Sequence, residues 1–182
     1  MEHHNLGRSY TRSVKASLGP REEVREMDEG LVPYSTFFPE QAARETRSFT
    51  TRGDPVLADD EYGLLESYCA DPACACRRVM LNVLSRRQRE VLAAISFGFD
   101  RNSEFAGPFL DPLNRQSASA GNLLVAVREV LADPVYVARL EAHYYQVKGA
   151  AADPKHPGHR RSHHAERAQR GRSVRQPGRR AR

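Results

Sequence analysis

All three cysteines of this 182-residue chain lie within eight residues, in the segment YCADPACACRRV. Their spacing is Cys69-x4-Cys74-x-Cys76. Thiolate sulfur is a ligand that Zn²⁺ favours, in a tetrahedron of four ligands with metal–sulfur distances of about 2.3 Å. Arg77 and Arg78 follow directly, and their positive charge favours the thiolate form. The cluster therefore predicts a metal site, with zinc as its cofactor.

We expect this cluster to lie in a hairpin. Cys69 ends one expected strand, Cys76 begins the next, and Cys74 lies in the connecting turn, which Asp71 and Pro72 would tighten. Side chains that face each other across a hairpin lie within about 5 Å. The three thiols are therefore expected to converge on one point.

A fourth ligand is missing from the cluster itself, and His143 is the expected candidate. It is the only histidine between residues 5 and 155, and it follows Leu140 by three residues at the border of an apolar helix face. A water molecule or a carboxylate such as Asp71 is the alternative. A solvent-open fourth position would instead suit a thiol- or metal-dependent enzyme.

Two interpretations without metal remain open for the cysteines. Cysteine is a good small core residue, and Cys69 continues an apolar strand, so the thiols could be reduced and structural. A Cys69–Cys76 cross-strand disulfide is geometrically conceivable, but it would leave Cys74 unpaired. In either case His143 would be an ordinary half-buried helix residue.

The strands that would position the cysteines are predicted from apolar residues that alternate with a period of two. This alternation predicts strands over residues 76–85 and 90–99. Residues 61–69 are predicted as a further strand, and residues 47–52 as an edge strand. The short charged turn RRQR joins two of them, which suits a hairpin tip. We therefore expect an antiparallel meander of three to four strands with one apolar face to be covered.

Helices are expected to supply that cover. The segment NLLVAVREVL has apolar residues at helical spacing, and Asp133 followed by Pro134 is typical of the start of another helix. That second helix is predicted over residues 134–148, with Gly149 as its end. Residues 105–117, rich in Pro and Gly, predict a loop. The predicted fold class is α+β, a meander covered by two C-terminal helices.

The segment before the meander, LVPYSTFFPEQAARETR, contains an aromatic cluster bracketed by Pro33 and Pro39. We expect the cluster to pack onto the core without forming a regular element. A short helix is predicted after it, over residues 40–46.

Composition predicts one modest domain with polar appendages, since hydrophobic residues are 40% and charged residues 28% of the chain. No apolar run approaches the roughly 18 residues that a membrane helix needs. The stretch MEHHNLGRSYTRSVK lacks the apolar region of a secretory signal, so we expect a cytoplasmic protein with reduced thiols. The predicted organisation is a disordered or weakly helical segment 1–30, an α+β domain 31–149 and a disordered Arg/His-rich tail 150–182.

The positive charge is concentrated in the tail. Residues 153–182 carry ten basic and two acidic side chains, a net charge of +8, which leaves −3 for residues 1–152. This tail predicts non-specific nucleic-acid binding as an alternative function. Five arginines of the expected strands and their turn could add a phosphate-binding face, although a solvated strand edge is the interpretation we favour. They are Arg77, Arg78, Arg86, Arg87 and Arg89.

Motifs of common catalytic sites are missing from the sequence. It has no phosphate-binding glycine loop, no G-x-S-x-G elbow and no H-E-x-x-H pair. No catalytic residue is therefore predicted, and a zinc-binding structural or adaptor module, with an unknown protein partner, is favoured over an enzyme.

Four segments carry a resemblance to an uncharacterised family of small bacterial proteins. They are VPYSTFFPEQAARETR, EYGLLESYCADPACACRRVMLNV, GPFLDPLNRQS and DPVYVARLEAHYYQVK, within residues 31–148. The resemblance implies a shared fold and a shared metal site, but no assigned activity. Some similar chains carry a small cysteine-rich metal motif at the C-terminus, where this chain has its Arg/His tail.

Overall fold

The structure, a computed structural model, describes residues 31–100, 102 and 105–159. The predictions for the N-terminal segment 1–30, and those for the tail beyond residue 159, lie outside the described residues.

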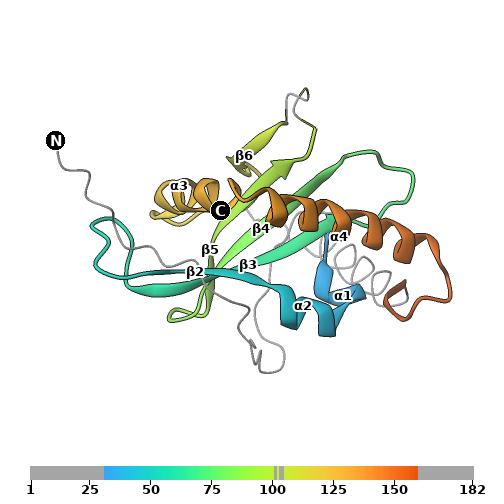
Figure 1. Ribbon diagram of the computed structural model, residues 1–182, viewed down its shortest axis with the longest axis horizontal. Coiled ribbons are helices and arrows are strands. Elements are labelled where there is room, and N and C mark those ends of the chain that lie inside the picture. The colour runs from blue at the N-terminus through green and yellow to red at the C-terminus, as the bar shows by residue number, and fades with distance from the viewer. Residues whose placement is uncertain (1–30, 101, 103–104, 160–182) are drawn as a thin grey trace, which may run out of the picture.

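A six-stranded antiparallel sheet forms the centre of the described fold (Figure 1). The strands are β1 (Leu31–Pro33), β2 (Arg47–Thr51), β3 (Asp60–Cys69), β4 (Arg78–Ser85), β5 (Glu90–Gly98) and β6 (Gly107–Leu110). Their order is β1-β3-β4-β5-β6. β2 pairs with the first half of β3, and β1 pairs with its last three residues. The antiparallel sheet of the predicted α+β class is thus present, with β3, β4 and β5 as its meander.

The predicted number of three to four strands was too low, because β1 and β6 were missed. These strands have only three and four residues, which is too few to show an alternation of apolar and polar positions. Each also contains a proline, Pro33 or Pro108, which argues against a central strand and is tolerated at an edge. Residues 105–117, predicted to be a loop, therefore include a strand that pairs with β5.

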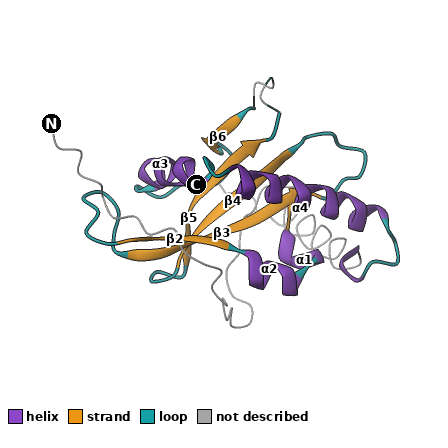
Figure 2. Cartoon of the chain, in the orientation of Figure 1, coloured by secondary structure: helices purple, strands orange, loops and turns teal. Residues whose placement is uncertain are grey.

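Helices accompany the sheet within the described residues, as Figure 2 shows. They are α1 (Tyr34–Phe37), α2 (Pro39–Glu45), α3 (Ala120–Val130) and α4 (Pro134–Ala152). The aromatic cluster after Pro33 forms the single turn of α1, in which Tyr34 and Phe37 are buried. Buried side chains of α1, α3 and α4 join those of one sheet face in the main core.

Strand pairing decides which residues reach that core. Partners in register share a face, so the pair Leu81–Ile95 faces the helices together with Glu66, which lies opposite Leu81. On the opposite face, Leu31, Met80 and Ala94 form a smaller buried cluster beside Cys69. Cys69 thus lies at the end of β3, half-buried beside this second cluster.

The start of α4 follows the prediction, and its end does not. The Asp133 carboxylate accepts a hydrogen bond from the backbone N–H of Val135 at 2.9 Å, directly before Pro134. The helix continues through Gly149 to Ala152, because Ala150 and Ala151 are buried and extend its apolar face. The predicted domain boundary at residue 149 therefore falls inside a helix. The packed chain continues further, to Gly158 against Phe37.

The close approach at the end of β5 generates a test of the fold. A Cβ atom added at Gly98 would lie 2.4 Å from the backbone carbonyl oxygen of Phe105, so the backbone would have to shift. We expect Gly98→Ala to lower the free energy of unfolding by roughly 1–3 kcal/mol, measured from the urea midpoint. Gly63→Ala is the matched control, because no atom lies within 4 Å of its added Cβ. Equal midpoints for the two variants would contradict this packing.

Candidate metal centre

The three thiols converge as predicted. The Sγ atoms of Cys69, Cys74 and Cys76 all lie within 4.8 Å of one another. A tetrahedral zinc ion separates its sulfur ligands by roughly 3.8 Å, given zinc–sulfur bonds of about 2.3 Å. Small side-chain adjustments are therefore enough to bring all three sulfurs to bonding distance. Each thiol is reduced and half-buried, so the cluster is neither a disulfide nor a sealed part of the core.

The loop that joins β3 to β4 turns Cys74 back toward the end of β3. The Asp71 carboxylate accepts a hydrogen bond from the Ala73 N–H at 2.9 Å, and the Asp71 carbonyl accepts one from the Cys74 N–H at 3.2 Å. A carboxylate that binds the backbone two residues onward is typical of a tight turn. The turn predicted at Asp71 and Pro72 is therefore present.

Cys76 lies in this loop and not in β4, which begins at Arg78. Between them, Arg77 has a φ of 28°, a left-handed conformation that is unfavourable for a residue with a side chain. Two contacts hold it there: its carbonyl accepts a hydrogen bond from the Phe99 N–H at 3.0 Å, and its side chain forms an ion pair with Glu141 of α4. The backbone turn at Arg77 lets Cys76 face the other two thiols from outside the strand.

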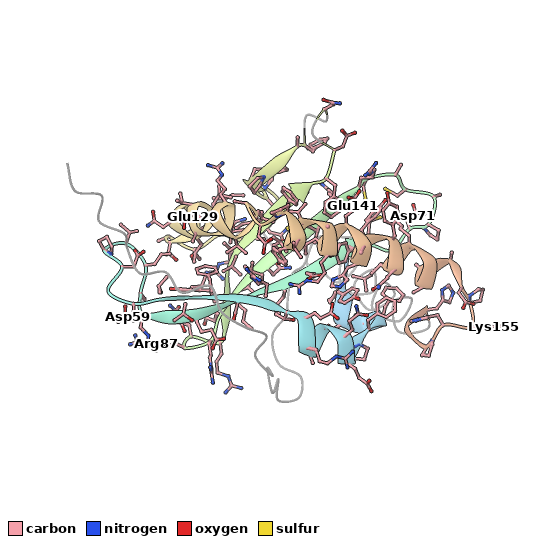
Figure 3. All side chains as sticks on the ribbon, in the orientation of Figure 1. Asp59, Asp71, Arg87, Glu129, Glu141 and Lys155 are labelled. Carbon is pink, nitrogen blue, oxygen red and sulfur yellow. The ribbon has the colours of Figure 1, made fainter. Side chains whose placement is uncertain are left out.

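α4 also holds the middle of the loop through Lys148. Its ammonium group donates hydrogen bonds to the carbonyl oxygens of Asp71 at 2.5 Å and Cys74 at 2.8 Å. Figure 3 shows Asp71 and Glu141 at the same end of the molecule, beside α4. The sequence analysis missed Lys148 and Glu141. Their spacing of seven residues puts them on one side of a helix, but it does not show that this side meets the cysteine loop.

The thiols differ in acidity in the metal-free protein. A hydrogen bond from the Cys76 thiol lowers the pKa of Cys74, and this effect, with smaller ones from the Cys76 N–H, the Cys69 thiol and the Lys148 charge, outweighs burial. Burial raises the pKa of Cys76 to about 12, together with its hydrogen bond to Cys74 and the negative charge of its two neighbours. Cys74 is therefore the first of these two to become a thiolate.

His143 is not the fourth ligand in this arrangement, which corrects the prediction. Its Nδ1 lies 2.7 Å from Glu66 Oε2 and its Nε2 lies 3.0 Å from Glu45 Oε2, so both ring nitrogens are occupied by carboxylates. The helical spacing correctly indicated that His143 faces the sheet, but not which part of the sheet it meets. Within the described residues, no fourth His, Cys, Asp or Glu joins the three thiols, and Asp71 is no exception.

The strand arginines do not form one patch. Arg77 pairs with Glu141 at one end of β4, while Arg86 pairs with Glu61 at 2.6 Å at the other end. The eight residues of β4 separate these ends by roughly 26 Å. This separation favours solvated strand ends over a single phosphate-binding face.

Comparisons with known proteins find no relative: no family model, no curated protein and no solved structure matches this chain. Among the helices of the described ranges, none is both long enough and apolar enough to span a membrane.

The difference in acidity predicts an order of reaction. In reduced protein freed of metal, iodoacetamide at about pH 8 should modify Cys74 several-fold faster than Cys76, because the thiolate is the nucleophile. Peptide mass spectrometry after short exposures measures both rates in one sample. Faster modification of Cys76 would contradict the arrangement of hydrogen bonds described above.

Proposed function

We propose that Cys69, Cys74 and Cys76 bind one zinc ion, and that the protein is a metal-stabilised structural or adaptor module. The observation that carries this proposal is the convergence of three reduced thiols from a strand end and a loop. Thiolates are soft ligands that suit zinc well, and a shared ion joins segments that have few contacts of their own.

The loop between β3 and β4 has little other support. Asp71, Pro72, Ala73 and Ala75 are exposed, so burial of apolar side chains contributes little to its conformation. Most of the hydrogen bonds described for it come from its own turn and from Lys148. A metal ion bound by three thiolates would add the cross-link that such a loop lacks, and its binding free energy would stabilise the folded state.

The charge balance of the site also supports zinc. One Zn²⁺ ion with three thiolates has a net charge of −1, and Lys148, next to the loop, supplies a compensating positive charge. The Arg77 guanidinium is already paired with Glu141. The fourth position is left for water or for a side chain of a partner, and the latter would make the site an adaptor contact.

Metal analysis tests the proposal directly. Untagged protein, purified without chelators, should contain about one zinc ion per chain, and removal of the ion should lower the urea midpoint because binding stabilises only the folded state. Cys74→Ser should lower the zinc affinity far more than tenfold, because it removes a direct ligand. Competition with a zinc-binding dye measures the affinity.

Ala75→Ser is the matched control, since it adds the same hydroxyl group to an exposed position between two of the cysteines. It should keep full zinc occupancy. Protein without stoichiometric zinc, or a Cys74→Ser variant that keeps full occupancy, would refute the zinc site.

Lys148 should affect the affinity without touching the metal. Lys148→Met removes both hydrogen bonds to the loop but keeps most of the aliphatic side chain, so we expect the zinc dissociation constant to rise about tenfold. Lys148→Arg, which can still donate to carbonyl oxygens, should recover part of the loss. Dissociation constants for the two variants that both equal the wild-type value would show that the loop is positioned without Lys148.

A further inference from the structure

A second group of ionisable side chains lies between β3, α2 and α4 and takes no part in the cysteine cluster. Its centre is His143, which is only 2% exposed. The ring stacks on Tyr34 with 4.2 Å between centroids and 12° between planes. Each ring nitrogen faces a carboxylate, Glu66 from β3 at 2.7 Å and Glu45 from α2 at 3.0 Å.

These two contacts determine how many protons His143 carries. A neutral imidazole has one N–H and one lone pair, so it can donate to only one carboxylate. Glu66 Oε2 also accepts a hydrogen bond from the Tyr68 hydroxyl at 2.7 Å. With both carboxylates ionised, the two contacts are satisfied together when His143 is an imidazolium that donates from Nδ1 and Nε2.

The two carboxylates differ in their access to water. The Glu66 side chain is 3% exposed, whereas that of Glu45 is 31% exposed. If the ring loses one proton, its remaining N–H has to serve one of the two. A buried carboxylate without a donor is strongly destabilising, while an exposed one can turn to solvent. The remaining N–H of the ring therefore keeps its hydrogen bond to Glu66, and the hydrogen bond to Glu45 is lost.

α2 depends on this contact because it has little else to hold it. None of its residues is buried, and Ala42 only packs against the edge of the core. Gln41 supports the same junction through its amide, which donates a hydrogen bond to Glu45 Oε2 at 3.2 Å. The same amide nitrogen lies 3.5 Å from His143 Nε2, and it makes no hydrogen bond there while that ring nitrogen is protonated.

Other polar groups around the ring do not compete for this proton near neutral pH. Burial raises the pKa of the Tyr34 hydroxyl, and the Glu66 and Glu45 charges raise it further. Burial likewise raises the pKa of the Tyr68 and Tyr136 hydroxyls. The remaining groups are two amides, Gln41 and Gln146, and two arginines, Arg47 and Arg139, which lie over the Tyr136 ring at 5.6 and 5.2 Å.

We propose that Glu66, His143 and Glu45 form a proton-dependent latch that holds α2 against α4 and releases α2 when His143 loses a proton. The latch is separate from the zinc site and does not depend on it. Its ligand is the proton itself, bound between three elements that are far apart in the sequence.

The direction of the pH effect follows from Glu45 and His143, the two side chains that join α2 to α4. Burial alone would raise the pKa of Glu45, but hydrogen bonds from Gln41 and His143, with positive charge from His143 and Arg139, lower it overall. Glu45 therefore stabilises the closed latch above its unfolded-state pKa and stops doing so as the pH falls through the lowered value. Closing takes up a proton at His143, so the latch weakens as the pH rises.

Amide hydrogen exchange of the full chain tests the latch. Rates for residues 40–46, corrected for intrinsic exchange, are measured from about pH 5 to about pH 9, the range in which imidazole titrates. At pH values where His143 is protonated in the closed latch and neutral in the open one, opening releases one proton. The opening constant of α2 should therefore rise about tenfold per pH unit in that range. Amides of β4 serve as the internal reference and should show no such slope.

Variants separate the latch from a general loss of stability. Glu45→Gln should abolish or reverse the slope while the sheet stays folded, because Glu45 is partly exposed and lies outside the core. Glu40→Gln removes the same charge from an exposed position of the same helix and should keep the wild-type slope.

The ring nitrogen shifts of His143, measured by NMR, should show an imidazolium at the acidic end of the range. The latch is refuted by a wild-type opening constant that does not change with pH. It is equally refuted by a Glu45→Gln variant with the wild-type slope, or by a neutral His143 ring throughout.

Discussion

The register of β3 is the constraint on which the rest of the structure depends. This ten-residue strand pairs with β1 and β2 along one edge and with β4 along the other. It places Glu66 and Tyr68 toward the helices and ends at Cys69. A slip of one residue would turn the two polar side chains to the opposite face and move Cys69 away from the other two thiols. Both chemically interesting groups of the molecule therefore depend on one strand alignment.

α4 is the second element common to both groups. Glu141 and Lys148 contact the segment around the cysteines, while His143 points to β3 and α2. The helix thus has two polar contacts on different sides and an apolar face between them that packs in the core. Its docking is determined by polar geometry as well as by burial of apolar side chains.

Periodicity predicted the long elements well. In β4 and β5 every second residue of the core face is apolar, namely Val79, Leu81 and Val83 in β4 and Ala93, Ile95 and Phe97 in β5, and the start of α4 has both an Asp cap and a following proline. The convergence of the cysteines could also be predicted, because the turn at Asp71 depends on local sequence. The missed strands β1 and β6 are short, contain proline and form only because a neighbouring strand is already in place.

The position of His143 could not be predicted for a different reason. Helical spacing gives the direction in which a side chain points around the helix axis. Which residue of the sheet it then meets depends on the position of α4 along the strands. The nearest polar group on β3 is Glu66, a buried carboxylate that needs a donor. Glu66 becomes buried only in the assembled fold. The sequence therefore shows a glutamate in a strand, but it does not show that this carboxylate needs a positively charged partner.

The spacing of His143 and Lys148 also restricts which lengths of α4 are compatible with this fold. Five residues along an α-helix correspond to a rise of roughly 7.5 Å and an angular offset of roughly 140°. An insertion or deletion of one residue between them would rotate one side chain by about 100° relative to the other. The helix could then keep the carboxylate contacts or the loop contacts, but not both. Substitutions between these positions preserve the helical phase, whereas changes of length in this turn and a half do not.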